Sequence, residues 1–163
     1  MKTKPKTKLQ PIIIKEDGIF CIQHYRKGKL LSETKIHNTA TAVGKAVVAG
    51  LINEASSGGF KWIALDSSST TATTTDTALA TEITANGCAR ASASCTRTTT
   101  DDTNDTAQLL HTWTASGTQS VRGAGIFDTS TQSGGTLLDR ATFAVKSMES
   151  TDTLAITYKV DID

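Results

Sequence analysis

The last segment of the chain, residues 153–162, alternates apolar and polar side chains without a break, and this pattern constrains the fold more than any other feature. The apolar set is Leu154, Ile156, Tyr158, Val160 and Ile162. The intervening set is Thr153, Ala155, Thr157, Lys159 and Asp161. Successive side chains on a strand point to opposite faces, so one face is buried and the other meets water. A strand with these two faces is typical of an antiparallel β-sandwich.

Short strands are predicted along most of the chain. Residues 18–26 and 29–37 form a hairpin around a glycine turn. Other expected strands cover residues 10–15, 60–65, 88–97, 107–115, 121–127 and 137–145. The 29 threonines and 14 serines agree with this, because threonine is β-branched and polar enough for an outer face. We therefore predict a mainly β protein, an antiparallel β-sandwich of jelly-roll-like character.

Two helical segments interrupt the strands. In residues 41–55 an apolar side chain recurs at every fourth position, which predicts one helix with its apolar stripe against the core. The stripe consists of Val43, Val47, Leu51 and Ala55. Asn38 or Thr39 is expected to cap the start of this helix. Asp76 is expected to cap a short helical turn over residues 77–83.

The charge is unevenly distributed along the 163 residues, which suffice for one domain. Residues 1–50 carry a net charge of +7, and residues 51–163 carry −6. The basic density peaks at Lys2, Lys4, Lys6 and Lys8. We expect residues 1–9 to form a basic flexible arm and residues 10–163 to form a single sandwich domain. The arm either contacts an acidic surface or is a solvated tail. Four lysines without aromatic or arginine neighbours bind phosphate weakly, so nucleic acid is not an expected partner.

The sequence allows two interpretations of the three cysteines, free thiols or a disulfide. Cys88 and Cys95 are seven residues apart, whereas zinc sites usually contain closer pairs. On a regular strand they would lie about 23 Å apart and on opposite faces. We expect free or buried thiols at Cys21, Cys88 and Cys95, with a disulfide within or between subunits as the alternative.

Sequence motifs for catalysis are missing. No G-x-S-x-G, H-E-x-x-H or glycine-rich phosphate motif occurs. The histidines are isolated from one another, and the acidic cluster 101–105 lacks the spacing of a calcium loop. We therefore predict no enzyme activity, no cofactor and no metal site. No apolar run is long enough to span a membrane, and the run 12–14 is too short for a signal peptide.

Several segments together resemble a family of small virion proteins of tailed bacteriophages. They are 38–45 (NTATAVGK), 62–66 (WIALD), 76–83 (DTALATEI), 123–128 (GAGIFD), 133–140 (SGGTLLDR) and 152–158 (DTLAITY). The resemblance covers roughly residues 18–162, and its most specific part lies in the last three segments. The basic segment before Leu9 has no counterpart in the family pattern.

This resemblance implies a non-enzymatic structural protein that is assembled in the host bacterial cytoplasm and resides in the virion. Its implied partners are the major capsid protein or other virion subunits, with further copies of itself on the particle. A capsid decoration or cement subunit is favoured, because a compact sandwich with an extended arm suits that position. A tail, neck or fibre-base component is the alternative. A glycan-binding surface domain is favoured less, because only 5% of the residues are aromatic.

Overall fold

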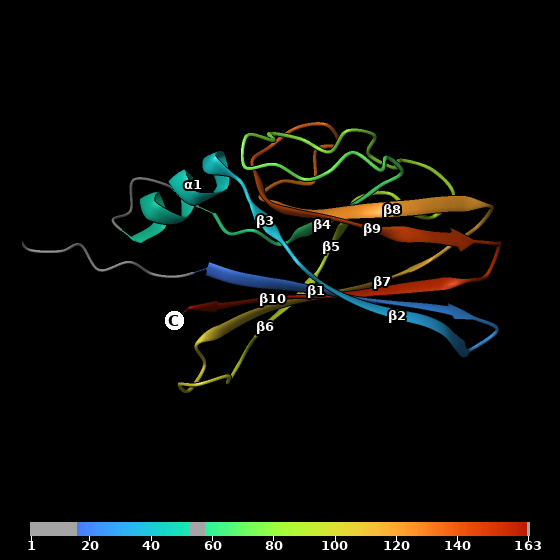
Figure 1. Ribbon diagram of the computed structural model, residues 1–163, viewed down its shortest axis with the longest axis horizontal. Helices are drawn as coiled ribbons and strands as arrows, with labels where there is room; N and C mark the ends of the chain where they lie inside the picture. The colour runs from blue at the N-terminus through green and yellow to red at the C-terminus, as the bar shows by residue number, and fades with distance from the viewer. Residues whose placement is uncertain (1–15, 53–57, 163) are drawn as a thin grey trace, which may run out of the picture.

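The computed structural model describes residues 16–52 and 58–162, which form two five-stranded antiparallel sheets packed face to face (Figure 1). Sheet A has the strand order β2-β1-β10-β7-β6, and sheet B has the order β3-β9-β8-β4-β5. The strands of sheet A are β1 Glu16–Arg26, β2 Lys29–His37, β6 Ser94–Thr98, β7 Thr106–Thr114 and β10 Thr153–Ile162. Those of sheet B are β3 Thr39–Ala40, β4 Trp62–Asp66, β5 Ala91–Ser92, β8 Gln119–Phe127 and β9 Leu137–Met148. The predicted mainly β antiparallel sandwich is confirmed.

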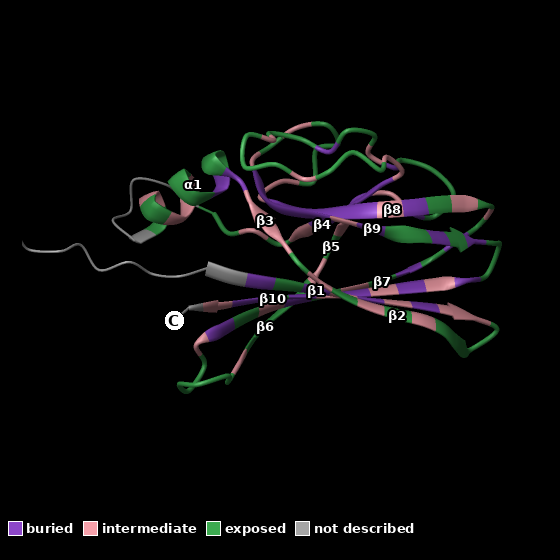
Figure 2. Ribbon diagram, in the orientation of Figure 1, coloured by how far each residue is buried: buried purple, intermediate pink, exposed green. Residues whose placement is uncertain are grey.

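The main core lies between the two sheets. Figure 2 marks the buried residues along their strands in purple. Sheet A contributes Phe20, Ile22, Leu154, Ile156 and Tyr158 to the core. Sheet B contributes Ile63, Leu65, Val121, Ala124 and Ile126. The alternation predicted for the last strand is confirmed, because Ile156 is fully buried and its neighbour Thr157 is partly exposed on the outer face.

Sheet B is buried on its outer face as well. The segment 67–82, drawn in green above β8 and β9 in Figure 1, covers this face. A second, smaller core lies beneath it, formed by Ala64, Leu79, Phe127 and Leu137. We call residues 67–82 the threonine-rich cover. The outer face of sheet A has no such cover among the described residues.

The helix α1, Ala42–Ile52, occupies the predicted place but buries a different side. Val43 and Leu51 of the predicted stripe are each 38% exposed. The buried position is Gly44, where an added Cβ would lie 2.6 Å from the Cα of Leu138. The helix therefore packs through a glycine that allows close approach to β9. The cap is Thr41, whose Oγ1 accepts a hydrogen bond from the Gly44 N–H at 3.0 Å.

Two other expectations were wrong, and one lies outside the described residues. The helical turn predicted over 77–83 does not form, because the backbone bonds to β4 instead: Glu82 forms a bridge with Asp66 and the Ile83 N–H donates to the Leu65 carbonyl, after a turn at residues 80–81. The single strand predicted over 88–97 is divided: β5 joins sheet B and β6 joins sheet A. The strand predicted over 10–15 and the basic arm lie outside the described residues.

Candidate functional site

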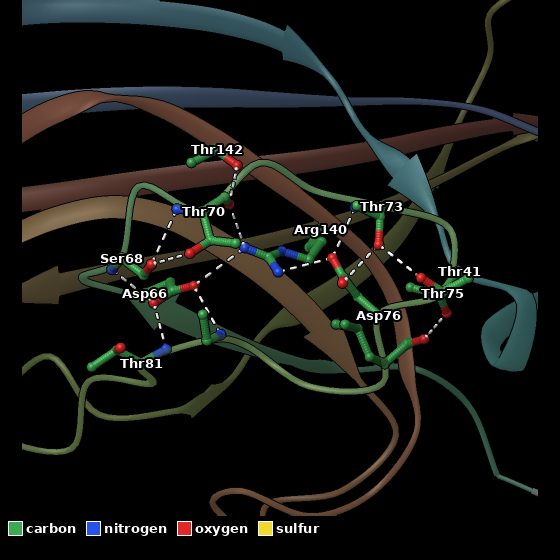
Figure 3. Close-up of polar contacts among 12 residues, drawn as sticks. Thr41, Asp66, Ser68, Thr70, Thr73, Thr75, Asp76, Thr81, Arg140 and Thr142 are labelled. Carbon is green, nitrogen blue, oxygen red and sulfur yellow. Dashed lines mark hydrogen bonds and ion pairs between the residues drawn. The ribbon is translucent and has the colours of Figure 1, made fainter.

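Buried charged groups hold the threonine-rich cover onto sheet B, and they form the main polar centre of the described structure. Arg140 of β9 is 2% exposed and reaches outward from sheet B (Figure 3). Its Nη1 donates to the carboxylate of Asp76 at 2.9 Å. Its Nη2 lies 3.5 Å from the carboxylate of Asp66 and donates to the backbone carbonyl of Thr70 at 2.9 Å. One side chain thus binds β4 and two points of the cover.

The acidic partners of Arg140 are themselves fixed by hydrogen bonds. Asp66 is fully buried, and its carboxylate accepts backbone N–H groups of Ser68 and Thr81, both at 2.9 Å. Burial would raise the pKa of Asp76, but hydrogen bonds from Thr73 and the charge of Arg140 together hold that pKa below its usual value. Asp76 is therefore ionised near neutral pH, and both carboxylates accept hydrogen bonds from fixed donors.

A second buried arginine fastens the other end of the cover. Arg90 makes a two-pronged ion pair with Glu82, with both N–O distances at 2.8 Å. Its Nη1 donates to the carbonyl oxygens of Thr129 and Gly134, both at 3.0 Å. The guanidinium also lies 3.7 Å from the ring centroid of Phe127. Arg90 therefore joins the cover to the loop between β8 and β9.

A third buried charged group, Asp152, lies at one end of the sandwich in the turn between β9 and β10. Asp152 is buried and accepts hydrogen bonds from Arg26 at 2.8 to 3.1 Å and from the backbone N–H of Glu149 at 2.9 Å. The His24 ring lies 3.1 Å from the same carboxylate. The hydrogen bonds from Arg26 are the largest cause that lowers the pKa of Asp152 well below its usual range.

We predict that Asp152→Asn flattens the acid dependence of stability. A carboxyl whose pKa is lowered by folding stabilises the folded state above its unfolded pKa of about 3.9, and that contribution is lost as the pH falls. The wild type should lose stability steadily below about pH 5. The variant should be less stable at pH 7 and should have a shallower slope below pH 5, measured by urea unfolding. Asp101→Asn at an exposed loop is the control, and equal slopes in all three proteins would contradict this role of Asp152.

The predicted cysteine site resolves into three free thiols at separate places. Cys88 is fully buried in the main core, and burial raises the pKa of its thiol. Cys21 is partly buried on the outer face of sheet A, where burial again raises the thiol pKa. Cys95 is exposed on the edge strand β6. The structure has no disulfide between these cysteines, and Cys21 and Cys95 are the two that solvent reaches.

The other predicted residues do not converge. Lys2, Lys4, Lys6 and Lys8 lie outside the described residues. Among residues 16–52 and 58–162, no three His, Cys, Asp or Glu side chains are grouped as metal ligands. No helix in this described part of the chain is long and apolar enough to cross a bilayer.

A groove of about 570 Å³ lies on the outer face of sheet A, on the side away from the threonine-rich cover. Its floor includes Cys21, Thr157 and Lys159, and the loop after β6 contributes Thr100 to its wall. The lining contains hydroxyl, amide, ammonium and carboxylate groups, but no histidine and no aromatic ring. This composition suits the binding of a polar surface.

Sequence reasoning missed Arg140 and Arg90, the two residues that organise the cover. The available signal was each arginine's position beside a run of small or apolar residues, in LLDRA for Arg140 and in CARAS for Arg90. A charged residue inside such a run indicates a buried ion pair, although the run does not name the partner.

Comparison of the chain with protein-family models, with curated proteins and with solved structures finds no match.

Proposed function

We propose that this protein is a non-enzymatic structural subunit of a tailed bacteriophage particle, bound to the outside of the head as a decoration or cement subunit. The observation that carries the proposal is how the buried charges are used. Arg140 and Arg90 form ion pairs that fasten a threonine-rich segment over a sheet. These charges serve to build a fixed polar exterior, which a protein exposed on a particle requires.

The place where the chain enters the sandwich supports the same proposal. β1 begins beside the end of β10, since Glu16 pairs with Ile162. Asp161 of β10 pairs with Thr106, so β1 begins at the same end of the sandwich as the acidic loop that joins β6 to β7. Nine extended residues span about 30 Å at most, which is enough to reach a neighbouring subunit. The basic charge of the arm is suited to an acidic protein surface such as that of a capsid lattice.

The decisive experiment is an electron-microscopy reconstruction of the intact particle. Density for the sandwich on the outer surface of the head lattice is the expected result. Density in the tail, neck or fibre base would overturn the decoration role and favour the alternative placement. Absence of the protein from purified particles would overturn the proposal as a whole.

We predict that deletion of residues 1–9 leaves the fold intact but weakens attachment to the particle. The melting temperature should change by a few degrees at most, because β1 begins only at Glu16. Occupancy on particles that lack the native protein should fall at least tenfold, which corresponds to about 1.4 kcal/mol of binding free energy. Quantitative gel analysis of purified particles measures the occupancy.

Two full-length variants separate charge from length. Replacement of Lys2, Lys4, Lys6 and Lys8 by glutamine should lower occupancy, whereas replacement by arginine should preserve it. Unchanged occupancy after the deletion would show that the arm is a passive tail.

A further inference from the structure

The outer face of sheet A carries exposed large apolar side chains on both sides of β10. Ile19 of β1 and Leu110 of β7 are 37% and 39% exposed on this face. They lie on the two strands that flank β10, where Ile19 pairs with Lys159 and Leu110 pairs with Thr157. The thiol of Cys21 lies beside them on the groove floor. Ile19 lines the groove, and Leu110 lies on the same face outside the groove lining.

The same face carries charges of both signs. Lys35, Lys159 and Asp161 line the groove, and Lys159 makes no ion pair with any described residue. The loop 99–105 forms a rim, where Asp101 and Asp102 are exposed and their carboxylates accept no hydrogen bond from the described residues. The groove therefore presents two ammonium groups and one carboxylate, and its rim presents two further carboxylates.

Hydrogen bonds from backbone N–H groups to the Asp105 carboxylate fix the conformation of the acidic loop 99–105. The carboxylate of Asp105 accepts the backbone N–H groups of Thr100 at 2.9 Å and of Asp101 at 2.8 Å, and also bonds that of Asp102. Burial would raise the pKa of Asp105, but these hydrogen bonds outweigh it and lower that pKa far below its usual value. The side chains of Asp101 and Asp102 are thus presented outward from a preorganised loop, which reduces the entropy cost of docking.

We propose that two copies of this chain pair through the outer faces of sheet A, with the acidic loop 99–105 of each copy seated over Lys159 of the other. If the two copies are related by a two-fold axis, the contact between loop 99–105 and Lys159 occurs twice, because an isologous interface uses the same patch on both subunits. The exposed side chains of Ile19 and Leu110 are covered in the pair. This inference depends on the surface of the sandwich and not on the proposed place in a virion.

A glycan is a weaker candidate for the same groove. Sugar rings stack on aromatic side chains, and the groove lining contains none. Tyr25 lies outside that lining on the same strand as Cys21, and its hydroxyl hydrogen-bonds to Gln23 at 3.1 Å. The charges of the rim and floor match each other, so a second copy of the chain fits the surface better than a neutral sugar.

Sedimentation analysis of the full-length protein with a reciprocal charge reversal tests the pairing. The wild type should form dimers between about 1 and 100 μM. Lys159→Glu alone, or Asp101→Lys with Asp102→Lys, should weaken dimerisation at least tenfold. An equal mixture of the two variant proteins should restore dimers, because each loop then faces a floor of opposite charge. Lys45→Glu, on the exposed side of α1, is the matched control and should dimerise as the wild type does.

Three results would overturn the inference. The first is a wild type that stays monomeric throughout this range. The second is a mixture that remains as weak as the separate variants, and the third is assembly into species larger than dimers. Circular dichroism of each variant confirms its fold, so loss of pairing cannot be mistaken for unfolding.

Thiol cross-linking places the interface on this face. In a Cys95→Ser background, a short bifunctional maleimide should join two subunits through Cys21, because Cys88 is buried. The dimer band should disappear in Cys21→Ser and should fall strongly in Lys159→Glu. Cross-linking that proceeds only through Cys95, in a Cys21→Ser protein, would assign the contact to the β6 edge and refute the proposed face.

Discussion

Ile156→Asp is expected to abolish soluble folding, whereas Thr157→Asp is expected to leave the fold intact. Ile156 is fully buried on β10, the central strand of sheet A, and belongs to the main core. An aspartate there would place a charge among apolar side chains with no partner, which costs several kcal/mol even after its pKa rises. A domain of ordinary stability, about 5–15 kcal/mol, loses most of its margin by such a change.

The neighbouring position supplies the matched control, because Thr157 lies on the opposite face of the same strand and is partly exposed. Both variants introduce the same charge at adjacent positions, so the difference in their stability measures the effect of burying that charge. Soluble yield and thermal melting followed by circular dichroism measure the difference. Similar melting temperatures for the two variants would refute the assignment of the inner and outer faces of β10.

Arg140→Met is expected to reduce the free energy of unfolding by about 3–5 kcal/mol, the cost of removing one partner from a buried ion pair. Asp66 would remain fully buried without its cationic partner, and the carbonyl of Thr70 would lose the Nη2 donor. Methionine keeps much of the apolar volume of the arginine stem, so the loss reports mainly on the charge. Urea unfolding measures it.

Arg122→Met is the control for this prediction. Arg122 is a partly buried residue of β8 that makes no ion pair with the described residues. Its replacement should cost less than about 1 kcal/mol. The threonine-rich cover should also become sensitive to limited proteolysis in Arg140→Met and remain resistant in Arg122→Met. Equal losses in both variants would show that the Arg140 ion pairs do not stabilise the cover.

Local patterns in the sequence determined the strands and the fold class. The alternation in residues 153–162 predicted β10 and its buried face, and the segments around the glycine turn predicted the β1–β2 hairpin. Such predictions succeed because the side chains of a strand point alternately to its two faces, so a two-residue period appears directly in the sequence.

The tertiary structure alone decided which groups meet across long separations. Arg140 and Asp66 are 74 residues apart, and neither local context indicates the other. The buried side of α1 was also decided by tertiary contacts. The helix is apolar on most sides, and the close approach of Gly44 to Leu138 selects the side that is buried. The cover over sheet B likewise depends on distant ion pairs. The hydrophobic period of a segment shows which of its residues lie on the same face. Packing between segments decides which face is buried and which element covers it.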